Sequence, residues 1–159
     1  MCNDTYITNT GQIVKVIPAE ERLMKRKDSL ANKQKKVYVA TSLYNAEVAK
    51  QVIQRFREND VKITYDWTTH GKITEESLLK EYGEAEAQGV FDADLLFMIQ
   101  PARTGAHVEM GIAIGINIPI ILVLDGKSEA KTFHFVSNVH RFHSLEEAFQ
   151  SAIERLSND

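Results

Sequence analysis

Two periods of apolar residues alternate along this chain. Apolar residues recur every three or four positions over 46–58, which predicts an amphipathic helix. Near-continuous apolar runs over 93–99 and 119–124 are typical of strands covered on both faces. The predicted strands are 36–41, 61–65, 93–99, 119–124 and 132–136, and the predicted helices are 46–58, 74–91 (opened by a Thr-x-Glu-Glu cap), 106–116 and one capped by Ser144 that runs to about 156.

Strands that alternate with helices indicate a parallel sheet with right-handed crossovers. We therefore expect an α/β fold over 37–159: a single doubly wound domain whose five-stranded parallel sheet has flavodoxin-like order. Residues 1–36 are expected to form a short basic leader. The leader would hold a small hairpin over 5–17, turned at 9–11, and then a charged helical or flexible stretch.

Charge is distributed unevenly and narrows the function classes. Residues 1–36 carry 8 Lys or Arg against 4 Asp or Glu, whereas 37–159 carry 11 against 18. An acidic body argues against nucleic acid binding by the folded domain. The lone cysteine, Cys2, cannot form an intrachain disulfide, and no apolar run is long enough to span a bilayer. We expect a cytoplasmic protein without a membrane partner.

Polar residues directly follow the first three predicted strands, and doubly wound sheets bind ligands at the carboxyl ends of their strands. Hydroxyls, an aromatic face, acids and a guanidinium suit a sugar that carries a heterocyclic base better than they suit a metal ion. The partner we expect is therefore a small-molecule nucleoside or nucleotide. The candidate binding residues are Thr41, Ser42, Asn45, Asp66, Trp67, Arg103, Thr104 and Gly105.

Glu109 is the most unusual residue in this pattern. It is expected on the first turn of the helix over 106–116, among small and apolar neighbours. Plainer roles stay open: Glu109 could be a charge that satisfies the helix start, Ser42 and Asn45 could cap the helix over 46–58, and Trp67 could simply pack in a turn.

Metal and dinucleotide sites are not expected. The five histidines lack the spacing of a helical metal site, and no Gly-x-Gly-x-x-Gly follows the first strand. We therefore predict neither a metal nor another cofactor.

Three segments together resemble the nucleoside 2-deoxyribosyltransferase family, including its 2′-deoxynucleoside 5′-monophosphate N-glycosidase relatives. They are Val-Tyr-Val-Ala-Thr-Ser over 37–42, the strand that contains Ala93-Asp94, and Thr-Gly-x-x-x-Glu-x-Gly-x-Ala over 104–113. The resemblance covers roughly residues 37–145. It implies that Glu109 is the nucleophile that attacks the anomeric carbon and that the Tyr38 hydroxyl positions it. A carboxylate suits that chemistry, and we expect the helix N-terminus to keep it ionised.

The chain departs from the family at two positions. Eight residues before Asp94, where the family has an Asp that assists the departing base, it has Glu86. Six residues before Glu109, where nucleoside-acting members have an acid and a nucleotide-hydrolysing relative has a hydroxyl, it has Arg103. A guanidinium can clamp a phosphate with two hydrogen bonds, so Arg103 favours a 5′-monophosphate.

The expected function is cleavage or transfer at the N-glycosidic bond of a 2′-deoxyribonucleoside or its 5′-monophosphate. Hydrolysis and base transfer stay open, as does another N-glycoside such as a ribonucleotide. The alternative from another class is a non-catalytic nucleotide-binding sensor or sequestering protein. Asn138 resembles the family's late loop that reaches a neighbouring subunit, which implies a homo-oligomer with shared sites.

Overall fold

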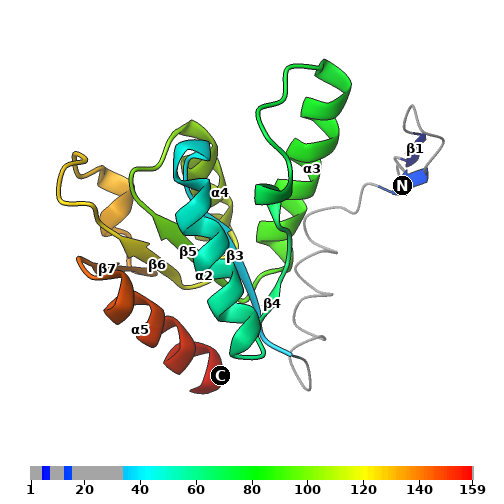
Figure 1. Ribbon diagram of the computed structural model, residues 1–159. Helices are drawn as coiled ribbons and strands as arrows, with labels where there is room; N and C mark the ends of the chain where they lie inside the picture. The colour runs from blue at the N-terminus through cyan, green and yellow to red at the C-terminus, as the bar shows by residue number, and fades with distance from the viewer. Residues whose placement is uncertain (1–4, 8–12, 16–33, 159) are drawn as a thin grey trace.

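The fold centres on a five-stranded parallel sheet with the strand order β4-β3-β5-β6-β7 (Figure 1). The structure is a computed structural model that describes residues 5–7, 13–15 and 34–158. The doubly wound α/β fold with flavodoxin-like order is thereby confirmed. The main elements are β3 (Lys36–Ala40), α2 (Ala46–Glu58), β4 (Lys62–Ile63), α3 (Glu76–Asp92), β5 (Leu95–Ile99), α4 (Thr104–Gly115), β6 (Ile120–Val123), β7 (Val139–Phe142) and α5 (Leu145–Asn158).

The core lies between this sheet and the helices on its two faces. Strands β5 and β6 are wholly buried, as their apolar sequences require, and each buried Leu or Ile side chain contributes roughly 1.5–3 kcal/mol. Helices α2 and α5 share one face, where the Phe56 and Phe149 ring centroids are 4.8 Å apart. Helices α3 and α4 cover the other face (Figure 1), which is the face that carries the candidate chemistry.

Helix α3 approaches the sheet unusually closely at Gly89. A Cβ atom built at Gly89 would lie 2.8 Å from the Tyr65 Cβ and 2.9 Å from the Tyr38 Cε2. Only glycine leaves room for both aromatic side chains. This contact sets the position of α3 over the centre of β3.

The fifth predicted strand was placed wrongly. Residues Thr132–Phe135 form a short 3-10 helix, η4, and the fifth strand is β7. The Phe133 and Phe135 side chains, which made the segment resemble a strand, are 64% and 60% exposed. β7 is an edge strand with polar side chains, so its sequence has little of the apolar signal of β5 and β6.

Several boundaries also differ from the predictions. Only Lys62–Ile63 pairs in the second predicted strand. Helix α3 starts at Glu76, and its preceding residue Glu75 makes no side-chain cap. The predicted cap of α5 is confirmed, because the Glu147 N–H donates to Ser144 Oγ at 3.3 Å. Helix α4 starts two residues earlier than predicted, which moves Glu109 to its second turn.

At the N-terminus, β1 (Thr5–Ile7) pairs antiparallel with β2 (Ile13–Lys15), within the segment where a small hairpin is predicted. The predicted turn at 9–11 and most of the predicted charged stretch up to residue 36 lie outside the described residues. Among the residues described, no helix is both long and apolar enough to cross a bilayer.

Candidate active site

Glu109 and Tyr38 form a buried pair on the α3 and α4 face of the sheet. Tyr38 lies at the middle of β3 and Glu109 on α4, and the Tyr38 hydroxyl donates to Glu109 Oε1 at 2.6 Å. Glu109 is only 8% exposed, and Tyr38 is fully buried. A buried carboxylate needs hydrogen-bond donors to offset its lost hydration. Tyr38 supplies one to Oε1, so the two side chains form a structural unit.

Burial changes the acidity of both groups. Desolvation raises the pKa of Glu109 to about 7, although the Tyr38 hydrogen bond lowers it and the Glu86 charge adds to the rise. Burial, together with the charge of Glu109, also raises the pKa of Tyr38, which therefore stays a phenol. Glu109 lies in the second turn of α4 rather than in the first, so burial has a larger effect on its pKa than the helix start. Perturbed pairs of this kind are typical of functional sites.

Glu86 lies on α3, close enough to this pair to act on it electrically. Its charge raises the pKa of Tyr38, Tyr65 and Glu109. Partial burial raises the pKa of Glu86 itself, while the nearby His70 lowers it. A half-buried acid with a raised pKa holds its proton more readily at neutral pH than an exposed one, which is what a proton donor requires.

Three aromatic side chains border Glu86 and were not predicted as a group. The Tyr65 hydroxyl and His70 Nε2 are 3.1 Å apart, and the His70 ring stacks on Tyr82 with centroids 4.1 Å apart. Tyr82 precedes Glu86 by one helical turn, so the two share a helix face. The four-residue spacing of Tyr82 and Glu86 is the one feature of the sequence that could have indicated this group. It is equally consistent with Tyr82 as an ordinary packing residue.

The loops that follow β3 and β5 are tied together at the carboxyl edge of the sheet. The buried Thr41 hydroxyl donates to the Ile99 carbonyl at 2.7 Å. The Asn45 amide donates to Thr41 Oγ1 at 3.3 Å and to the Gln100 carbonyl at 3.4 Å. Ser42 is also buried here, although its side chain caps no helix. Thr41, Ser42 and Asn45 therefore lie together, as the sequence predicts.

The third predicted cluster opens helix α4 at the same edge. Arg103, Thr104 and Gly105 are exposed, and the Arg103 guanidinium carbon lies 4.5 Å from the centroid of the Tyr44 ring. Tyr44 belongs to the short 3-10 helix η2 (Leu43–Asn45) that follows β3. The two loops therefore meet through this pair as well.

Asp66 and Trp67 have partners inside the protein. The Trp67 indole N–H donates to the Val39 carbonyl at 2.8 Å, and the side chain is buried. Arg57 donates to Asp66 Oδ2 at 2.8 Å. Although partial burial raises the pKa of Asp66, hydrogen bonds from Thr68 and Arg57 hold it below its ordinary value. These contacts support the packing role for Trp67 that the sequence left open.

Asn138 lies away from the other candidates. Its side-chain amide donates to the Ile118 carbonyl at 2.7 Å, and its own carbonyl accepts from the Ile120 N–H at 2.8 Å. Both contacts are at the amino ends of β6 and β7. Within one chain, Asn138 therefore lies at the amino ends of the strands, whereas the loops of the candidate site lie at their carboxyl ends.

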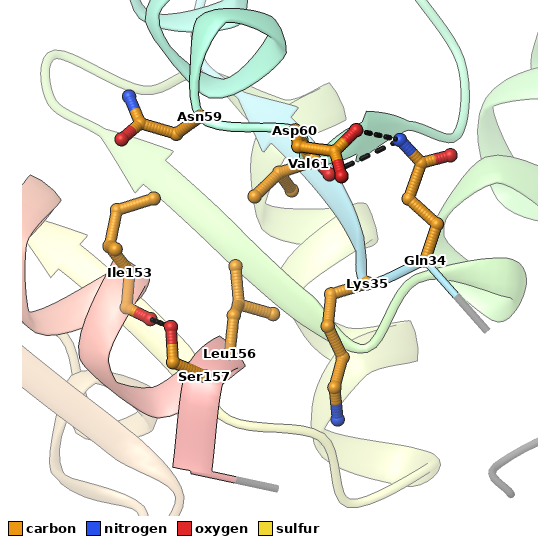
Figure 2. Close-up of a pocket in the computed structure, with 8 residues that line it drawn as sticks. All are labelled: Gln34, Lys35, Asn59, Asp60, Val61, Ile153, Leu156 and Ser157. Atoms are coloured by element: carbon orange, nitrogen blue, oxygen red, sulfur yellow. Dashed lines mark hydrogen bonds between the residues drawn. The ribbon is translucent and has the colours of Figure 1, made fainter. Parts of the chain in front are cut away.

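A depression of about 300 Å³ also lies at the amino ends of the strands, beside the end of α5 (Figure 2). Two of its polar side chains are engaged within the protein: Gln34 Nε2 donates to Asp60 Oδ1 at 2.8 Å, and the Ser157 hydroxyl donates to the Ile153 carbonyl at 2.8 Å. Neither Glu109 nor Glu86 lines it. We therefore place the candidate site at the other edge.

In the part of the chain that the structure describes, no three His, Cys, Asp or Glu side chains group so that they could hold a metal ion. The candidate site combines acids, phenols and hydroxyls with the Asn45 amide, the Arg103 guanidinium and the His70 imidazole.

Comparison with known proteins identifies relatives in fold only. No family model matches the sequence, and no curated protein matches it. Among solved structures, CMP N-glycosidase BcmB of Clostridium botulinum is 21% identical, with a TM-score of 0.54 over 74% of this chain and 98% of its own. The solution structure of BlsM is 18% identical, with a TM-score of 0.55 over 78% of this chain and 92% of its own. This chain shares their fold.

Proposed function

We propose that this protein is an enzyme that cleaves the N-glycosidic bond of a 2′-deoxyribonucleoside or its 5′-monophosphate. The observation that carries the proposal is the buried 2.6 Å hydrogen bond between Tyr38 and Glu109, near the carboxyl edge where doubly wound sheets bind ligands. The likeness in fold to a CMP N-glycosidase supports the cleavage of an N-glycosidic bond. So does the sequence resemblance to the nucleoside 2-deoxyribosyltransferase family.

In this mechanism Glu109 is the nucleophile. Tyr38 engages Oε1, so Oε2 attacks the anomeric carbon of the sugar. The C–N bond breaks as the glycosyl ester forms, and its electron pair leaves with the base. Attack requires the ionised carboxylate, and a pKa of about 7 leaves a large fraction of Glu109 ionised at neutral pH. The same burial makes the carboxylate a stronger nucleophile than a hydrated one.

Glu86 assists the departing base. Its raised pKa favours the protonated form, which gives its proton to a ring nitrogen of the base as the C–N bond breaks. Water then gives its hydroxyl to the sugar and its proton to the Glu86 carboxylate, which cleaves the ester, or a second base takes the sugar and loses its ring N–H proton to Glu86 in a transfer reaction. Either route regenerates the Glu109 carboxylate, and neither requires a cofactor.

The loops at the sheet edge bind the rest of the substrate. Thr41, Ser42 and Asn45 offer hydroxyl and amide groups to the sugar and its 5′ side, as do Thr104 and Gly105 at the start of α4. Arg103 carries the charge that a 5′-phosphate requires.

We also propose a homo-oligomer in which Asn138 serves the site of a neighbouring subunit. Within its own chain Asn138 lies at the amino ends of the strands, away from the candidate site. It can therefore contact a bound nucleotide only in the site of a partner subunit. Light scattering after size-exclusion chromatography tests this, and a monomer at working concentration would contradict it.

Chromatography of free base tests the main proposal. A panel of nucleosides and 5′-monophosphates, deoxy and ribo, is incubated with and without an acceptor base. We expect release from deoxy substrates that is lost in Glu109→Gln and falls about 10²–10⁴-fold in Glu86→Gln. No release from any substrate, with ligands still raising the melting temperature, would instead support a nucleotide-binding protein without turnover.

A further inference from the structure

An exposed aromatic ring and an exposed cation meet where the two edge loops approach each other. The Tyr44 side chain is 82% exposed, yet its ring centroid lies 4.5 Å from the Arg103 guanidinium carbon. Among the described residues Arg103 forms no ion pair with a carboxylate. The ring of Tyr44 is therefore the group that locates this charge.

The backbone beneath the pair is fixed by hydrogen bonds. Thr41 Oγ1 donates to the Ile99 carbonyl at 2.7 Å, and Asn45 Nδ2 donates to the Gln100 carbonyl at 3.4 Å. These bonds link the loop that carries Tyr44 to the loop that carries Arg103. Only the two side chains must then be ordered, so little conformational entropy is lost when they meet.

An anionic substrate needs such a charge at this edge. The ionised Glu109 that the mechanism requires repels a phosphate that carries up to two negative charges. A guanidinium that rests its face on an aromatic ring keeps its in-plane N–H groups free, and those groups match two phosphate oxygens. The Tyr44 ring therefore holds Arg103 without consuming its hydrogen-bond donors.

We propose that Tyr44 is a positioning residue that presents Arg103 to the 5′-phosphate and so gives the enzyme a preference for nucleotides over nucleosides. This inference rests on the proposed function and deepens it. It assigns the preference to two side chains. Arg103 contacts the phosphate, and Tyr44 acts through Arg103.

Steady-state kinetics of Tyr44→Ala and Tyr44→Phe with a deoxynucleoside and its 5′-monophosphate test the inference. An exposed cation–π pair corresponds to a change of about two- to fivefold. We expect Tyr44→Ala to raise KM for the monophosphate by about that factor, with kcat and the KM for the nucleoside unchanged. Tyr44→Phe retains the ring and should match the wild type.

Leu43→Ala is the matched control, because Leu43 is its neighbour in η2 and is also exposed. It should leave the nucleotide preference unchanged. An equal rise in KM in Leu43→Ala would point to general loop disturbance and overturn the inference. So would Tyr44→Phe behaving as Tyr44→Ala, or Tyr44→Ala behaving as the wild type.

Calorimetric binding of the 5′-monophosphate separates this inference from the proposed function. If the wild type releases no base but Tyr44→Ala still weakens binding, the proposed function fails and the positioning role stands. If the wild type releases base and Tyr44→Ala binds the monophosphate as tightly as the wild type, the positioning role fails alone.

Discussion

At the scale of residues, the chemistry depends on one carboxylate in an unusual place. Glu109 is buried against the Tyr38 hydroxyl, and that burial raises its pKa to about 7. An exposed glutamate would be fully ionised at neutral pH and well hydrated, hence a weak nucleophile. This arrangement lowers the free energy of unfolding, because the folded protein buries a carboxylate charge that water would solvate better.

The stability cost of Glu109 depends on pH. Its pKa is raised from 4.5 to about 7 on folding, so the folded state holds the proton more tightly than the unfolded state. The favourable contribution of the protonated Glu109 side chain to the free energy of unfolding is fully present below pH 4.5. It is lost as the pH rises through 7. We expect the wild type to lose about 3 kcal/mol relative to Glu109→Gln across that interval. Urea unfolding of both proteins at a series of pH values measures it, and a difference that stays constant with pH would contradict the assigned burial.

At the scale of elements, the position of helix α3 determines how near Glu86 lies to Glu109. The helix carries Glu86 and rests on the Tyr38 and Tyr65 side chains at Gly89. A close helix-to-strand contact therefore sets the height of α3 over the Tyr38 and Glu109 pair. The position of Glu86 follows from this packing.

Gly89→Ala should push α3 away from the sheet. Its Cβ would lie 2.8 Å from the Tyr65 Cβ and 2.9 Å from the Cε2 of the fully buried Tyr38, so the helix must shift to relieve both contacts. We expect a loss of roughly 1–3 kcal/mol in the free energy of unfolding, together with reduced base release. Gly83→Ala, on the same helix with nothing within 4 Å of its Cβ, is the matched control.

Gly83→Ala should gain about 1 kcal/mol in the free energy of unfolding, because alanine has a higher helix propensity than glycine. Denaturant unfolding of both variants distinguishes the two effects. Equal stabilisation by Gly89→Ala and Gly83→Ala would show that the close approach of α3 has no energetic weight.

How well each element could be predicted depended on its burial. The sequences of β5 and β6 are apolar throughout because both faces are covered, and both were predicted within two residues at each end. The edge strand β7 lacks that pattern. The fifth strand was instead predicted over the segment that contains Phe133 and Phe135, whose side chains are exposed. Glu109 was recognisable because an acid is unexpected among small apolar neighbours. The contacts of His70 with Tyr65 and Tyr82 depend on tertiary packing and were not visible in the sequence.

At the scale of the whole molecule, the doubly wound topology brings distant segments together. Tyr38 on β3, Glu86 on α3 and Glu109 on α4 meet on one face because β3 and β5 are neighbours in the sheet and α3 and α4 cover the same side (Figure 1). The fold supplies the scaffold, and these side chains supply the chemistry that we propose.

The most direct test of the central claim is to trap the glycosyl ester on Glu109. Enzyme mixed with its best deoxynucleotide is quenched in acid within milliseconds to seconds, and the intact protein and its peptides are weighed by mass spectrometry. We predict a transient gain of one deoxyribosyl 5-phosphate unit on the peptide that contains Glu109, and no such gain in Glu109→Gln. Base release at the wild-type rate from Glu109→Gln, with no adduct on the wild type, would contradict the account.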